Sequence, residues 1–228
     1  MIEDRIRELN ERLVVMVTVA RNMVECSVRA LVEKDEDLAH QVIERDEVKL
    51  NQMEIENLED AVKIIALYQP TATNLRMLVT ALAVNRDVER IGDHAENVAG
   101  FALYLIPRPQ LKPLIDIPRM TEAVMRMLDD SLRSMLNGDE KLAKEVIVAD
   151  SEVDQLDRQV LQDVIGYMTK DPASIDRGTR LILISQNLER IGDLATNIAE
   201  SVLYVTKSQL YLHRKKDIIR ELEEKGQK

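Results

Sequence analysis

DVERIGDHAENVAGFALY at residues 87–104 is repeated as NLERIGDLATNIAESVLY at residues 187–204. The two stretches align at an offset of 100 positions, and both contain the run E-R-I-G-D. A match this dense within one chain indicates an internal duplication. We therefore expect two equivalent halves that pack with pseudo-twofold symmetry.

The composition predicts an all-α fold of long helices. Aromatic residues make up 3% of the chain, and Gly (7) and Pro (6) are rare, which leaves few turns. Apolar residues recur at steps of three and four, as they do on helices that bury one face. The expected helices lie at about 3–33, 36–67, 71–105, 118–137, 139–170 and 174–208.

The second of these helices carries many apolar residues. Those expected to face inward are Leu38, Val42, Leu50, Met53, Leu58, Val62 and Ile65. Asp35 is a candidate N-cap for this helix, and Asn137-Gly138 is a C-cap signal at the end of the fourth.

The prolines divide the six helices into two sets of three. Four of the six prolines lie in the segment IPRPQLKPLIDIP at 106–118, which we interpret as the linker between the halves. The sequence thus predicts two tandem three-helix bundles, at 1–108 and 116–212, followed by a charged tail at 213–228.

The net charge and the hydropathy of the chain disfavour several classes of function. The formal net charge of -10 disfavours nucleic-acid binding, because such a surface repels phosphate backbones. We find no run of 18 apolar residues, so we expect a soluble, cytoplasmic protein that reaches membranes only by docking to a membrane complex. Since no nucleophile–base pair or glycine-rich phosphate loop is recognisable, we expect a non-enzyme.

Two acidic pairs lie in the repeated stretch. Glu89 and Asp93 are four residues apart, as are Glu189 and Asp193. On a helix this spacing puts both carboxylates on one face, roughly 5–6 Å apart at Cβ, where like charges repel by a few tenths of a kcal/mol. A bound cation would reverse that repulsion, so the repeated pair predicts a metal site in each half.

A second acidic pattern lies on the preceding helix of each half. Asp150 and Asp154 stand before Leu156-Asp157, and Glu47 and Asn51 stand before Met53-Glu54. If these helices pack antiparallel to the helices of the repeated stretch, four oxygen-bearing side chains meet in each half. Asn97 and Asn197, one turn beyond the acidic pairs, could each add a carbonyl oxygen.

The donor types favour hard cations. Carboxylates and amides suit Mg²⁺, Ca²⁺, Mn²⁺ or iron, whereas structural zinc favours Cys and His. The candidate ligands are Glu89, Asp93, Glu189, Asp193, Asp150, Asp154, Glu47, Asn51, Asn97 and Asn197. The three histidines form no cluster by spacing, and we expect His94 at the surface or beside a ligand.

A simpler interpretation stands beside metal binding. The chain has 41 acidic residues, so pairs four apart also arise by chance on solvated helices, and Arg90 and Arg190 could neutralise them as ordinary ion pairs. Gly92 and Gly192 fit either account. Glycine inside a helix costs roughly 1 kcal/mol against Ala, so either close packing or a metal-bridged helix pair gains from the missing side chain.

The doubled E-R-I-G-D motif and the stretch YQPTATNLR at 68–76 resemble the PhoU family over nearly the whole chain. The resemblance implies two three-helix bundles and metal clusters held by E(D)-x-x-x-D pairs. It implies iron as the cofactor, with Mg, Mn, Ca, Ni or Zn as alternatives. Asn51 departs from the family pattern, because a neutral amide replaces the final acid of the companion motif in the first half.

The resemblance also implies a role. Family members are accessory proteins that restrain high-affinity phosphate uptake and signal phosphate sufficiency. The implied partners are the ATPase subunit of a phosphate ABC transporter, a sensor histidine kinase and a second copy in a homodimer. The alternatives are a ferritin-like di-metal enzyme or metal-storage bundle and a purely structural bundle. The enzyme class would use Glu-x-x-His steps, and the chain has none.

Overall fold

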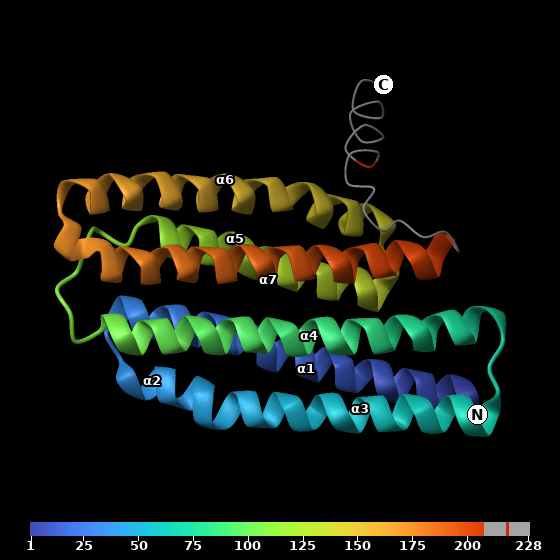
Figure 1. The fold of residues 1–228 in the computed structure, drawn as a ribbon. Coiled ribbons are helices and arrows are strands. Elements are labelled where there is room, and N and C mark those ends of the chain that lie inside the picture. The colour runs from blue at the N-terminus through green and yellow to red at the C-terminus, as the bar shows by residue number, and fades with distance from the viewer. Residues whose placement is uncertain (208–217, 219–228) are drawn as a thin grey trace, which may run out of the picture.

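The computed structural model describes residues 1–207 and residue 218, and no strand occurs within them. The elements are α1 (Ile2–Glu33), α2 (Glu36–Gln41), η1 (Val42–Asp46), α3 (Glu47–Tyr68), α4 (Ala72–Leu105), α5 (Asp116–Asn137), α6 (Glu140–Lys170), η2 (Pro172–Ser174) and α7 (Ile175–Lys207). They form the two tandem three-helix bundles that the sequence predicts (Figure 1).

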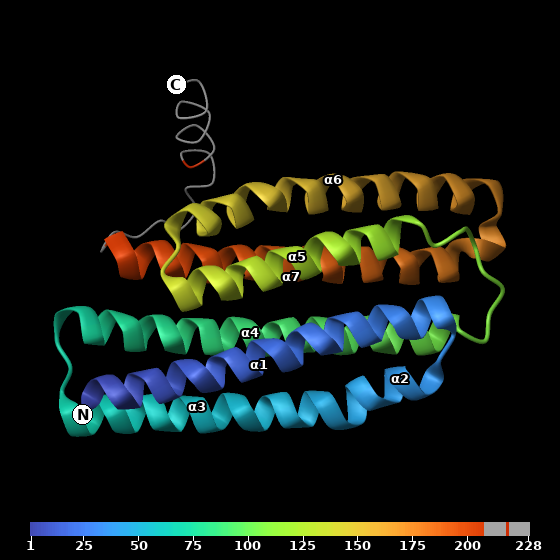
Figure 2. The same ribbon diagram turned by 180° about the vertical axis from the view of Figure 1, so that it is seen from behind.

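The bundles meet through α4 and α7, with α1 also touching α5. Both views show α4 and α7 running in opposite directions side by side, with α3 and α6 on the two outer edges (Figure 2). The repeated stretch thus occupies the interface between the halves.

Aliphatic side chains fill the core, as the near-absence of aromatic residues requires. Leu13, Met16, Met23, Leu78 and Ile91 are fully buried. Fully burying one such side chain contributes roughly 1.5–3 kcal/mol. None of the helices formed by the described residues has the length and apolar character needed to cross a bilayer.

The predicted capping signals at Asp35 and Asn137-Gly138 are confirmed, and Asp139 caps α6 as Asp35 caps α2. The Asp35 carboxylate accepts a hydrogen bond from the Leu38 amide (3.1 Å), and Asp139 accepts bonds from the amides of Lys141 and Leu142. Gly138 ends α5 in the left-handed region at φ 61°, where a side chain would be strained.

Two predictions for the second helix were wrong. The stretch from 36 to 67 is not one regular helix, because the π-turn η1 separates α2 from α3. Leu58 and Val62 do not face the core, since they are 46% and 53% exposed. The inward face of α3 is instead formed by Leu50, Asn57, Asp60, Ala61 and Ile64.

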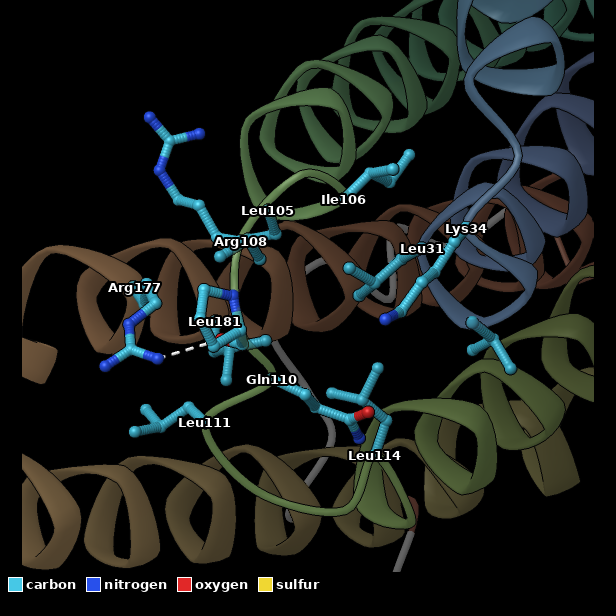
Figure 3. A pocket seen from close by; sticks show the side chains of 12 residues that line it. Leu31, Lys34, Leu105, Ile106, Arg108, Gln110, Leu111, Leu114, Arg177 and Leu181 are labelled. Carbon is cyan, nitrogen blue, oxygen red and sulfur yellow. Dashed lines mark hydrogen bonds between the residues drawn. The ribbon is translucent and has the colours of Figure 1, made fainter.

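The linker between the bundles is fastened to the second of them. Arg177 on α7 donates a hydrogen bond to the Pro109 carbonyl oxygen at 2.8 Å. A cavity of about 230 Å³ lies beneath the linker, with Leu111, Leu114 and Leu181 among its lining side chains (Figure 3). The predicted tail at 213–228 lies outside the described residues except for Ile218, which is buried.

The two equivalent glycines differ in the space around them. A Cβ at Gly92 on α4 would overlap the Cδ2 methyl of Leu50 on α3. At Gly192 on α7 it would lie 3.4 Å from Val153, the residue of α6 that corresponds to Leu50. Close helix packing therefore explains Gly92 directly.

We predict that Gly92→Ala is about 1–3 kcal/mol less stable than Gly192→Ala in urea unfolding, because only the first overpacks the core. Both variants gain the same helix propensity, about 1 kcal/mol, so the difference isolates the overlap. Leu50→Val, which places the second repeat's residue in the first, should rescue Gly92→Ala. Equal stabilities of the two glycine variants would refute this account.

Candidate metal centre

The first-half site lies where α3 packs against α4. Glu47 on α3 and Asp93 and Glu96 on α4 each offer a carboxylate oxygen, and these atoms lie within 4.8 Å of one another. All three residues are half-buried. This is the compact set of potential metal ligands found among the described residues, and its donors are oxygens that suit hard cations.

Glu96 was missed by the sequence analysis. It follows Glu89 by seven residues and therefore lies on the same face of α4, which was the available signal. The comparison of the repeats hid it, because the corresponding residue is Thr196. Glu96 supplies the first half with an acid that the second half lacks at that position.

Asn51 supports the first-half site through Glu47. Its side-chain amide donates a hydrogen bond to the Glu47 carboxylate. The neutral residue that departs from the acidic pattern therefore orients one of the three clustered acids.

Electrostatic strain is visible across the first-half acids. Burial, followed by the charges of Asp93 and Glu54, raises the pKa of Glu89. Burial, followed by the charges of Glu47 and Asp93, raises the pKa of Glu96. The carboxylates thus lie close enough to disfavour their joint ionisation, which a cation would favour.

The π-turn η1 sets the register of Glu47. Twelve positions separate the N-cap Asp35 from Glu47, whereas eleven separate the corresponding N-cap Asp139 from Asp150. A π-turn accommodates one extra residue in a helix. It therefore absorbs the one-residue difference between the repeats and lets Glu47 face α4 much as Asp150 faces α7.

The second-half site is more open. An open cavity of about 640 Å³ between α6 and α7 is lined by Asp150, Asp154, Glu189 and Asp193. Burial, and then the charges of Asp193, Asp157, Asp154 and Asp150, raise the pKa of Glu189 to about 7. All four predicted acids of this half therefore come together.

Two further acids belong to the second-half region. Glu200, buried and seven residues after Asp193, lines the same cavity and was not predicted as a ligand. Asp157 accepts a hydrogen bond from the Ser185 hydroxyl. The spacing of the acids along α6 and α7 could be recognised in the sequence. That Glu200 lines the same cavity became clear only from the fold.

Hydrogen bonds across the α4–α7 contact join the two sites. Asp87 is hydrogen-bonded to Asn197 of the other repeat, and burial raises the pKa of Asp87 to about 6. His94 contacts the Asn187 side-chain oxygen at 2.9 Å, and burial lowers the pKa of His94. A neutral His94 that carries its proton on Nδ1 can donate this bond.

The predicted asparagines and arginines take different places. Asn97 is exposed, whereas Asn197 lines the second cavity while bonding to Asp87. Arg90 extends from the first repeat to line the second repeat's cavity and lies 3.9 Å from Asp87. The second-half site therefore borders Arg90 of the first half.

Known proteins resemble this chain along nearly its full length. The PhoU domain family matches residues 13–102 and 117–202. The "Phosphate-specific transport system accessory protein PhoU homolog" of Aquifex aeolicus is 33% identical over 209 residues, covering 92% of this chain and 94% of that protein. "PhoU homolog 2" of Thermotoga maritima is 32% identical, covering 92% and 89% respectively.

Solved structures agree with these relatives. The crystal structure of PhoU from Pseudomonas aeruginosa superposes with a TM-score of 0.88 at 31% identity, covering 92% of this chain and 100% of that one. The phosphate transport system regulatory protein PhoU from Streptococcus pneumoniae, at 24% identity, shows the same fold with a TM-score of 0.86 and coverage of 92% and 99%.

We predict that the metal-free protein loses stability as pH rises from about 5 to 7.5. The pKa of Glu189 is about 7 in the folded state and near 4.5 when unfolded, so the folded state binds the extra proton between these values. Glu189→Gln should flatten this part of the pH profile and exceed the wild type in stability at pH 7.5. Urea unfolding with a chelator tests this, and an unchanged slope in the variant would contradict it.

Proposed function

The chain belongs to the PhoU family, and we propose that it is a metal-binding negative regulator of high-affinity phosphate uptake and phosphate signalling. The named relatives are accessory proteins of phosphate-specific transport. The observation that most directly supports metal binding is the convergence of Glu47, Asp93 and Glu96 within 4.8 Å.

Iron is the metal we propose first, following the family resemblance, with Mg, Mn, Ca, Ni or Zn as alternatives. Glu47, Glu89, Asp93 and Glu96 would hold it in the first half, and Asp150, Asp154, Glu189 and Asp193 in the second. A bound cation would supply the positive charge that these carboxylates lack, and it would link α3 to α4 and α6 to α7.

We propose that regulation works through shape and contact. Each set of acids spans two helices. Its net charge therefore affects how tightly the outer helices α3 and α6 pack against α4 and α7. Asn51 orients Glu47, and Asn197 and Asn187 tie the α4 and α7 segments together. Partners that bind these outer surfaces would therefore distinguish the metal-bound protein from the metal-free protein.

The partners we propose are the ATPase subunit of a phosphate ABC transporter and a sensor histidine kinase, with the protein acting in the cytoplasm as a homodimer. A ferritin-like enzyme is less well supported. Its sites use a Glu-x-x-His step from each of two helices. The compact acid cluster among the described residues consists of carboxylates alone, and His94 is directed to Asn187.

Removing the second-half acids should remove metal. We predict that Glu189→Gln with Asp193→Asn lowers the bound metal per chain, measured by elemental analysis of protein purified without an affinity tag. It should also shrink the loss of Tm caused by chelation, because a ligand stabilises only the state that binds it.

The matched control is Glu145→Gln with Glu152→Gln, which neutralises two exposed acids of α6 outside the cavity. It should leave metal content unchanged. Glu89→Gln with Asp93→Asn should remove the first half's share. Metal content that is the same in all these variants would exclude the proposed sites.

The regulatory role makes a separate prediction in cells. Deleting the gene should raise phosphate uptake in phosphate-rich medium. Supplying the wild-type protein should return uptake to its original level. The Glu189→Gln/Asp193→Asn variant should restore it only partly, whereas the Glu145→Gln/Glu152→Gln control should restore it fully. Uptake that does not respond to the deletion would count against the regulatory role while leaving metal binding intact.

A further inference from the structure

The cavity beneath the linker is lined by residues of both bundles (Figure 3). Its volume is about 230 Å³. Aliphatic side chains from α1, α4, α7 and the linker contribute to its wall: Leu31, Leu105, Leu181, Leu111 and Leu114. Ligand-binding pockets are mostly apolar and occur preferentially at the junctions between domains, so this cavity is a candidate binding site.

The duplication builds a counterpart of this cavity at the other end of the α4–α7 interface. The counterpart has a volume of about 90 Å³ and lies where α4 begins and α7 ends. Positions of α4 and α7 correspond at an offset of 100, and those of α1 and α5 at 104, as the N-caps Asp35 and Asp139 do. The corresponding lining residues are Leu31 and Met135, Lys34 and Gly138, Leu105 and Val205, Arg177 and Met77, and Leu181 and Ala81. Since the fold forms a cavity at both ends, the residues that differ indicate what is particular to the larger one.

Two cations distinguish the larger cavity from its counterpart. Lys34 and Arg177 occupy the positions that Gly138 and Met77 occupy in the smaller cavity. None of the described residues that line the larger cavity is acidic, although the chain has 41 acidic residues against 31 Lys and Arg residues. Figure 3 shows Lys34 extending toward the cavity from one side, with Arg177 on the opposite side. The charge around the cavity therefore complements an anion.

The backbone of Lys34 is strained, which points to a use for its side chain. Lys34 lies in the left-handed region at φ 58°, as does Gly138 at φ 61°. Glycine adopts this conformation freely, whereas any residue with a Cβ is disfavoured there. The neighbouring carboxylate of Glu33 pairs with Arg29 at 3.1 Å. Strained residues of this kind cluster at ligand-binding sites, so Lys34 has the conformation expected of a residue that contacts a ligand.

Arg177 is fixed in position beside the cavity and still has donors to offer. One of its Nη atoms donates a hydrogen bond to the Pro109 carbonyl oxygen at 2.8 Å, and the other lies 3.9 Å from the Asp171 carboxylate. A guanidinium group has five N–H donors, so these two contacts leave others for an anion. Arg108 also lines the cavity, but its guanidinium stacks on the Tyr104 ring, 3.5 Å from the centroid, and points away from the cavity (Figure 3).

The volume of the cavity limits the size of the ligand. One water molecule occupies about 30 Å³ in the liquid, so the cavity accommodates about eight non-hydrogen atoms. An aliphatic chain of about seven carbons therefore fills it. An acidic group attached to that chain would then lie at the opening, where Lys34 and Arg177 are found.

We propose that this cavity binds a small aliphatic carboxylate of about eight carbons. Its chain lies among the leucines, and its carboxylate faces Lys34 and Arg177, whose guanidinium matches the geometry of a carboxylate. The proposal goes beyond the regulatory role described above and depends on neither metal nor phosphate. Because both bundles and the linker line the cavity, the bound carboxylate also stabilises the contact between the two halves.

The test is isothermal titration calorimetry of the full chain with octanoate and related compounds. Octanoate should bind once per chain. From butanoate to octanoate, each added CH₂ group should tighten binding by about fourfold, because it buries more apolar surface. Dodecanoate should bind no tighter than octanoate, since the cavity is then full. Octanol, which has the chain without the charge, should bind at least about tenfold more weakly.

Variants at Lys34 locate the site and separate charge from strain. Lys34→Gln removes the charge and keeps the strained backbone, and it should weaken octanoate binding at least about tenfold. Lys34→Gly, which introduces the residue of the second half, should weaken binding equally but raise Tm by about 2–4 °C, because the strain is relieved. The matched control is Lys63→Gln on the exposed face of α3, which should bind octanoate as the wild type does.

Three results would overturn the proposal: octanoate that does not saturate the wild type by about 5 mM, octanol that binds as tightly as octanoate, or unchanged binding in Lys34→Gln. A peptide with leucine between two aspartates that binds more tightly than octanoate would also overturn it, because the cavity would then suit a protein partner. Elemental analysis and phosphate uptake test the proposed function separately, since Lys34 lies outside both sets of acids.

Discussion

The antiparallel contact between α4 and α7 is the constraint on which the rest of the structure depends. It brings the two E-R-I-G-D segments together, with Asp87 bonded to Asn197 and His94 to Asn187. Because these partners lie near the same positions in both repeats, the contact obeys the pseudo-twofold relation that the duplication creates. The faces of α4 and α7 that remain are then free to meet α3 and α6, which is where the acids gather.

Repulsion between the carboxylates at these faces destabilises the metal-free fold locally. The arrangement of the carboxylates differs between the two halves. In the first, Glu96 joins Glu47 and Asp93 in a compact set, while neutral Asn51 donates to Glu47. In the second, five acids line an open cavity of about 640 Å³, and burial followed by the neighbouring negative charges raises the pKa of Glu189 to about 7. The neutral Asn51 leaves the predicted first-half set one carboxylate short of the second-half set, and Glu96 restores the number of carboxylates.

The sequence was sufficient for the features that repeat or that cap helices. The duplication, the six helical segments, Asp35 and Gly138 could all be recognised, because each follows from a local rule. Leu58 and Val62 could not be placed, since α3 is apolar on two faces and steps of three and four fit both. The π-turn was not predicted either, because no local residue pattern marks it, and the one-residue difference between the repeats becomes clear only once both N-caps are known.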